Sequence, residues 1–129
     1  MRALVIDDSR TMRRIVSGAL QPLGFETQDA EHGRAALDLL EAGLDVDLAC
    51  IDWNMPVMDG LTFVGEVRAN PSWRHITLMM VTTESEQGQI VRALAAGAHE
   101  YLIKPFTGEA MLEKLDLLGL LPAPTGDLT

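Results

Sequence analysis

The stretch that decides the fold is Ala3-Leu4-Val5-Ile6-Asp7-Asp8, a short apolar run that ends in two acidic residues. A continuous apolar run of this length is typical of a strand that is buried on both faces of a sheet. The apolar residues that come next recur at the three- and four-residue spacing of a helix face, and this pattern stops near Pro22-Leu23-Gly24. The start of the chain therefore predicts a strand followed by a helix.

The same alternation of strand and helix patterns continues to the end of the chain. We expect further strands at 25–29, 48–51, 76–81 and 101–103, and helices at 34–40, 61–69, 90–98 and 107–119. The second strand is the most polar, which favours a position at the edge of the sheet. Five strands joined by right-handed helical crossovers predict a single α/β domain, a doubly wound (βα)5 parallel sheet in the flavodoxin-like order 2-1-3-4-5.

Composition excludes several classes of function. The 129 residues fit one domain, which we place at 1–119, followed by a flexible tail at 120–129 with two prolines. Ten Lys and Arg against 19 Asp and Glu give a formal net charge of -9, which disfavours direct binding to nucleic acid or to anionic membranes. The sole cysteine, Cys50, is interpreted as a small buried hydrophobe. Without a secretory pattern or a membrane-spanning stretch, the protein is expected to be cytoplasmic.

Acidic residues follow two strands that this fold places side by side. Asp7 and Asp8 come after the first strand and Asp52 comes after the third, so all three should meet in the crevice where the strand order reverses. Two carboxylates about 5 Å apart repel by roughly 3 kcal/mol at an effective dielectric of about 20. A hard divalent cation with oxygen ligands offsets this repulsion. The sequence therefore predicts a Mg²⁺ site at this edge of the sheet.

Thr82 and Lys104 end the fourth and fifth strands, and they should face the same crevice. A hydroxyl, an ammonium and a bound cation together provide the positioning and charge neutralisation that phosphoryl transfer requires. The sequence shows no serine or cysteine nucleophile beside a histidine base, so the candidate nucleophile is a carboxylate, Asp52.

These residues resemble the receiver domain of two-component response regulators over residues 1–119. The resemblance rests on Asp7-Asp8, Asp52-Trp53-Asn54-Met55-Pro56, Thr82 and Lys104-Pro105. Within this family, the loop through Met58-Asp59-Gly60, the position of Tyr101 and the absence of an output domain are most similar to stand-alone regulators of chemotaxis.

The resemblance implies a role for each residue of the site. Asp52 would accept a phosphoryl group from a histidine kinase. Asp8, Asp52 and the backbone carbonyl of Asn54 would bind Mg²⁺ directly, with Asp7 acting through water. Lys104 and Thr82 would contact the phosphoryl oxygens, and Thr82 and Tyr101 would form the switch. Asn54 and Glu84 would look out over the phosphoryl group, and the bond before Pro105 would be cis.

The resemblance also implies partners: a histidine kinase, a phosphatase and a target such as the flagellar motor switch, docked on the fourth helix, fifth strand and fifth helix. The protein would be a signalling switch rather than an enzyme, since it would catalyse only its own phosphorylation and dephosphorylation. A phosphorelay intermediate that passes the phosphoryl group to a histidine phosphotransfer domain is the alternative within the family.

Two alternatives belong to other classes. A Mg²⁺-dependent phosphohydrolase usually places its aspartate nucleophile after the first strand and needs a cap or a deep pocket for its substrate. A flavodoxin-like FMN carrier needs a hydroxyl- or glycine-rich loop where this chain has Asp7-Asp8-Ser9-Arg10. Plainer readings also exist, because Asp7 and Asp8 could serve only a helix N-terminus and Tyr101 could be an ordinary core residue. Trp53 is expected to be partly exposed beside the metal site.

Overall fold

The computed structural model describes residues 1–84 and 86–121. In that part of the chain five parallel strands form one sheet in the order β2-β1-β3-β4-β5. This confirms the fold class predicted from the sequence. The strands are β1 (Arg2–Ile6), β2 (Glu26–Ala30), β3 (Leu48–Ile51), β4 (Thr77–Thr82) and β5 (Glu100–Ile103). The helices are α1 (Arg10–Leu20), α2 (Gly33–Glu41), α3 (Gly60–Ala69), α4 (Gln87–Ala96) and α5 (Gly108–Leu117), with 3₁₀ turns η1 (Gln21–Leu23) and η2 (Pro71–Trp73).

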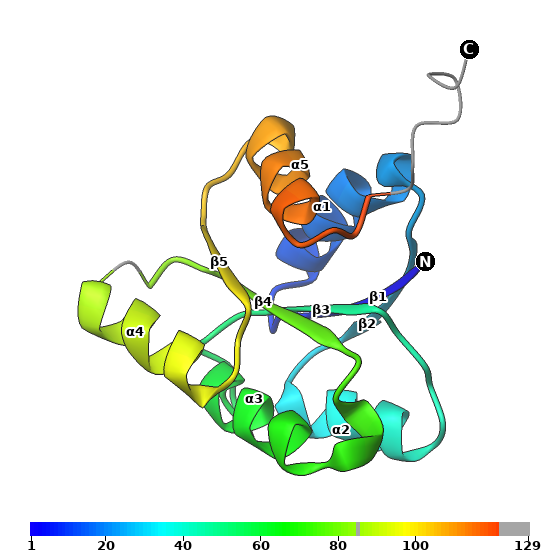
Figure 1. The fold of residues 1–129 in the computed structure, drawn as a ribbon, viewed down its shortest axis with the longest axis vertical. Helices are drawn as coiled ribbons and strands as arrows, with labels where there is room; N and C mark the ends of the chain where they lie inside the picture. The colour runs from blue at the N-terminus through cyan, green and yellow to red at the C-terminus, as the bar shows by residue number, and fades with distance from the viewer. Residues whose placement is uncertain (85, 122–129) are drawn as a thin grey trace.

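The helices cover both faces of the sheet, with α1 and α5 on one face and α2, α3 and α4 on the other (Figure 1). Successive side chains of β1 therefore enter different cores: Leu4 and Ile6 pack in the α2–α4 layer, and Ala3 and Val5 in the α1–α5 layer. All four are at most 1% exposed. This two-sided burial is why the strand is a continuous apolar run.

The edge position of β2 is confirmed, and its polar composition matches its exposure. Glu26, Gln28 and Asp29 are exposed, whereas Ala30 is buried. The strand starts one residue later than predicted, because the N–H of Phe25 still donates to the carbonyl of Leu20 at the end of α1. The Phe25 side chain is nevertheless buried in the α1–α5 core layer.

The helix ends follow the capping rules with one exception. Ser9 and Thr107 cap α1 and α5 by accepting hydrogen bonds from backbone N–H groups of the first turn, the Thr107 cap as predicted. The helix α4 has no side-chain hydrogen bond at its N-cap, Glu86. It ends at Ala96, two residues before the predicted end, because Gly97 adopts a φ of 122°.

The last described residues still belong to the fold. Leu120 donates its N–H to the carbonyl of Leu115, and Leu120 and Leu121 pack against the α1–α5 core layer. The rest of the expected tail, 122–129, lies outside the described residues. Within the described part of the chain, no helix combines the length and the apolar character needed to cross a bilayer.

Candidate functional site

The carboxyl ends of β1 and β3 bring the three acidic residues together. Ile6 and Ile51 are paired in the sheet, and the N–H of Asp52 donates to the carbonyl of Ile6, so both chains leave the sheet at the same level. One carboxylate oxygen from each of Asp7, Asp8 and Asp52 lies within 4.8 Å of the others. This proximity was predicted from the strand order and from the position of each acid directly after its strand.

A single ammonium group lies among these carboxylates. The Nζ of Lys104 is 2.7 Å from Oδ2 of Asp7 and 3.7 Å from Oδ1 of Asp52. Asp7 and Asp52 are 3% and 8% exposed, while Asp8 is open to solvent. Three carboxylates against one ammonium leave an excess of negative charge in a partly buried site.

The electrostatic environment acts on the protonation of Asp52. Burial raises the pKa of the Asp52 carboxyl group, and the nearby charge of Asp7 acts in the same direction. Lys104 and the hydrogen bond from the N–H of Trp53 oppose this shift without cancelling it. The ionised form of Asp52 is therefore held at an energetic cost, which a bound cation would reduce.

The donor set fits a hard divalent cation. The group consists of carboxylate oxygens without a histidine or cysteine, which is the chemistry that Mg²⁺ prefers. Asp8 is exposed, so a metal there would remain accessible to water and to a phosphate group. The backbone carbonyl of Asn54, which the resemblance implies as a direct ligand beside Asp8 and Asp52, accepts no hydrogen bond within the described residues. The residues present therefore fit Mg²⁺.

Glu84 connects the remaining residues of the predicted site. Its backbone N–H donates to Oγ1 of Thr82 at 3.3 Å, its carbonyl accepts a hydrogen bond from the hydroxyl of Tyr101, and its carboxylate accepts one from the amide of Asn54. The Thr82 side chain is fully buried, and Tyr101 is 6% exposed. Burial raises the pKa of the Tyr101 hydroxyl. The sequence pointed to Glu84 only by its position and gave no sign of these three bonds.

The loop after Asp52 is folded tightly against the start of α3. A Cβ atom at Gly60 would lie 2.2 Å from the carbonyl oxygen of Asp52, so only glycine fits there. The N–H of Gly60 donates to the carbonyl of Trp53, and Asp59 caps α3. On the other side of the site the Lys104-Pro105 bond is cis, as the resemblance implied.

The expectation that Trp53 is partly exposed is wrong. Its side chain is 8% exposed and packs in the α2–α4 core layer. The guanidinium carbon of Arg92, in α4, lies 5.8 Å from the centroid of the indole ring. The sequence could not predict that Arg92 lies over the Trp53 ring, because this contact depends on how α4 lies against the loop after β3.

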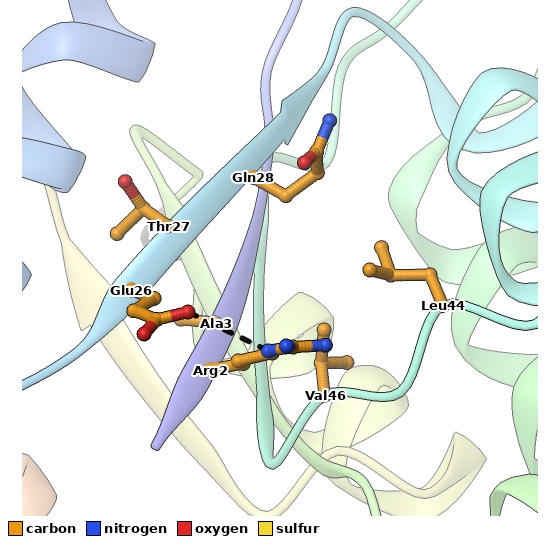
Figure 2. Close-up of a pocket in the computed structure, with 7 residues that line it drawn as sticks. All are labelled: Arg2, Ala3, Glu26, Thr27, Gln28, Leu44 and Val46. Atoms are coloured by element: carbon orange, nitrogen blue, oxygen red, sulfur yellow. Dashed lines mark ion pairs between the residues drawn. The ribbon is translucent and has the colours of Figure 1, made fainter.

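The hollow drawn in Figure 2 lies away from this site. It has a volume of about 290 Å³ and is bordered by the starts of β1 and β2 together with Leu44 and Val46. Its charged groups, Arg2 and Glu26, pair with each other at 3.6 Å. Parallel strands place this hollow at the opposite end of the sheet from the three carboxylates.

Comparison with known proteins extends over most of the chain. The family of response regulator receiver domains matches residues 3–116. The chemotaxis protein CheY1 of Helicobacter pylori is 44% identical over 119 residues, which cover 92% of this chain and 96% of that protein. The CheY homolog of Campylobacter jejuni is 46% identical over 121 residues, with 92% and 93% covered. The solved structure of the chemotaxis protein CheY4 of Vibrio cholerae is similar with a TM-score of 0.82 and 36% identity, over 90% of this chain and 96% of that one.

Proposed function

The chain belongs to the response regulator receiver family, and we propose that it is a phosphorylation-dependent switch in which Asp52 accepts a phosphoryl group from a histidine kinase. The proposal rests mainly on one observation. Asp52 lies buried beside Lys104, on the rim where Asp7 and Asp8 also end. A nucleophile, an acidic metal site and a cation for the phosphoryl oxygens are thus within reach of one another.

The chemical step is a transfer between nitrogen and oxygen. A carboxylate oxygen of Asp52 attacks phosphorus, a P–O bond forms, and the P–N bond of the kinase phosphohistidine breaks with its electron pair returning to the imidazole. Oδ1 of Asp52 accepts the N–H of Trp53 and faces Lys104. We therefore assign Oδ2 as the attacking atom.

The other residues hold the reactants. Asp8, Asp52 and the carbonyl of Asn54 would bind Mg²⁺, with Asp7 acting through water. When bound, the ion supplies neutralisation of negative charge on the carboxylates and on the phosphoryl oxygens. The ammonium of Lys104 pairs with a phosphoryl oxygen, and the Thr82 hydroxyl donates a hydrogen bond to another.

The output is contact with another protein. When Thr82 turns toward the phosphoryl group, its bond with Glu84 changes, and Tyr101 senses this through the carbonyl of Glu84. The helices α4 and α5 expose the apolar side chains of Val91, Leu94 and Leu112. We assign this surface of α4, β5 and α5 to the target. The chemotaxis names of the relatives favour a target in that pathway, such as the flagellar motor switch. The family resemblance adds a phosphatase as a further partner.

Labelling with acetyl phosphate in Mg²⁺ tests the proposal. Wild-type protein should become labelled and should bind beryllofluoride, whereas Asp52→Asn should do neither. Asp116→Asn is a matched control because Asp116 is an exposed acid on α5. Labelling of Asp52→Asn would place the nucleophile elsewhere. Pull-down with and without beryllofluoride then identifies the target, and capture of a histidine phosphotransfer domain would indicate a phosphorelay.

A further inference from the structure

Arg92 lies over the residue next to the phosphoacceptor. Its guanidinium carbon is 5.8 Å from the ring centroid of Trp53, within the range of a cation–π contact. Within the described residues Arg92 takes part in no ion pair. The indole ring is therefore the group that this exposed cation faces.

Trp53 touches the phosphoacceptor through its backbone. Its N–H donates to Oδ1 of Asp52 at 2.9 Å, and its carbonyl accepts the N–H of Gly60 at 2.9 Å. The ring is 8% exposed and packs in the α2–α4 core layer, so a contact that fixes the ring also restrains the backbone of the same residue. The orientation of the Asp52 carboxylate thus depends on where the indole is held.

The helix that carries Arg92 is lightly anchored. Ala93 is the one fully buried residue of α4, whereas α3 buries Phe63, Val64 and Val67. The N-cap of α4 makes no side-chain hydrogen bond, and Gly88 lies in the first turn. Contacts made by individual α4 side chains consequently have a large share in fixing this helix against the loop after β3.

We propose that Arg92 is a positioning residue for phosphoryl acceptance: its guanidinium holds the Trp53 ring, and thereby the N–H that orients Asp52, while it ties α4 to the phosphoacceptor loop. This inference rests on the proposed function and adds a route from Asp52 to α4 that does not pass through Tyr101. Arg92 lies between Val91 and Leu94 in the sequence of α4, and both of these residues are exposed. A protein that docks on α4 therefore acts on Asp52 through the same contact, since coupling is reciprocal.

The strength of the cation–π contact sets the expected size of the effect of removing Arg92. A cation–π pair at an exposed site corresponds to about a two- to fivefold change in an equilibrium constant. Arg92→Met should lower the affinity for beryllofluoride and the rate of labelling by acetyl phosphate by about this factor. Arg92→Lys should keep most of both, because the ammonium retains the charge over the ring.

Tryptophan fluorescence measures the solvent exposure of the Trp53 ring directly. The chain has two tryptophans, so a Trp73→Phe background leaves Trp53 as the emitting residue. In that background Arg92→Met should increase acrylamide quenching of Trp53. Arg14→Met is the control for charge, since Arg14 is exposed on α1, on the opposite face of the sheet (Figure 1). It should change neither quenching nor labelling.

A double-mutant cycle separates the contact from a general effect of charge. In a Trp53→Leu background Arg92→Met should have no further effect on labelling, because its partner is gone. An equal loss in both backgrounds, or unchanged quenching in Arg92→Met, would overturn the assignment. Asp52→Asn tests the proposed function separately from the role of Arg92. If this variant abolishes labelling while the cycle shows no coupling, the proposed function stands and Arg92 has no positioning role.

Discussion

The two ends of the sheet surround a partly buried cation with opposite kinds of partner. At the carboxyl end, Lys104 faces carboxylates that outnumber it. At the amino end, Arg68 of α3 donates to the carbonyls of Gly97, Arg74 and Ile76, and no carboxylate pairs with it among the described residues. These carbonyls precede β4 and β5, so Arg68 ties the end of α3 to the starts of two strands.

The difference separates stability from function. Three N–H groups of Arg68 each meet a backbone carbonyl, so these acceptors are satisfied within the fold. The carboxylates at the other end repel one another and retain oxygen atoms that a cation or a phosphoryl group can use. At the amino end the polar groups satisfy one another and stabilise the fold. At the carboxyl end the carboxylates need a bound cation or phosphoryl group, and this is the open end of the sheet.

The largest effect is expected at the amino end. Arg68→Met removes three hydrogen bonds and leaves carbonyl groups without partners, so the free energy of unfolding should fall by about 2–4 kcal/mol. Urea denaturation of Arg68→Met measures this, with the exposed Arg74→Met as control. The folded fraction should still accept label from acetyl phosphate. A loss no greater than that of Arg74→Met would mean that the carbonyls are satisfied without Arg68.

The opposite sign is expected at the carboxyl end. Asp8→Asn removes one of three mutually repelling carboxylates. Because Asp8 is exposed, water screens its repulsion, and without metal the variant should be more stable than the wild type by about 1 kcal/mol. Mg²⁺ at tenfold its dissociation constant should stabilise the wild type by about 1.4 kcal/mol, and Asp8→Asn by much less. Thermal melts with and without Mg²⁺ test both statements. Equal responses of the two proteins to Mg²⁺ would remove Asp8 from the metal site.

The two ends should also respond to acid in opposite directions. Burial raises the pKa of Asp52, so its ionisation destabilises the fold at neutral pH and this penalty disappears as the pH falls toward the unfolded value of about 3.9. Burial, followed by the charge of Arg68, lowers the pKa of His99, whose Nδ1 accepts the N–H of Leu78. The stability that neutral His99 contributes is present above about pH 6.5 and is lost below it.

Melting temperatures between pH 7 and pH 4 measure both effects. Asp52→Asn should exceed the wild type at pH 7 and approach it at pH 4. His99→Asn can keep an acceptor near the N–H of Leu78 without titrating, so its stability relative to the wild type should rise below pH 6.5. Parallel curves for the wild type and His99→Asn would show that His99 is not held neutral.

The sequence predicted one end of the sheet far better than the other. Asp7, Asp8 and Asp52 could be brought together because parallel strands end at one rim and each acid follows its strand directly. Arg68 gave no comparable signal, since its partners are backbone carbonyls that any residue could supply. The prediction for Trp53 failed for a similar reason: the ring packs in the α2–α4 core layer with Arg92 near it, and only the packing of that layer determines this. The sequence pattern within a single strand or helix could be used for prediction, whereas contacts between loops and helix ends could not be predicted.

The smallest effect is expected at the hydroxyl of Tyr101, where the open end of the sheet meets the surface. Tyr101→Phe keeps the buried ring and loses only the bond to the carbonyl of Glu84, so affinity for the target should fall about fivefold, the equivalent of about 1 kcal/mol. Labelling of Asp52 should be unchanged, because the hydroxyl lies outside the transfer itself. The protein captured in the beryllofluoride pull-down serves as the target, and Tyr101→Ala should weaken its binding further through lost packing. If both variants bind as tightly as the wild type, the open end must signal without Tyr101, and the contact between Arg92 and Trp53 becomes the remaining route to α4.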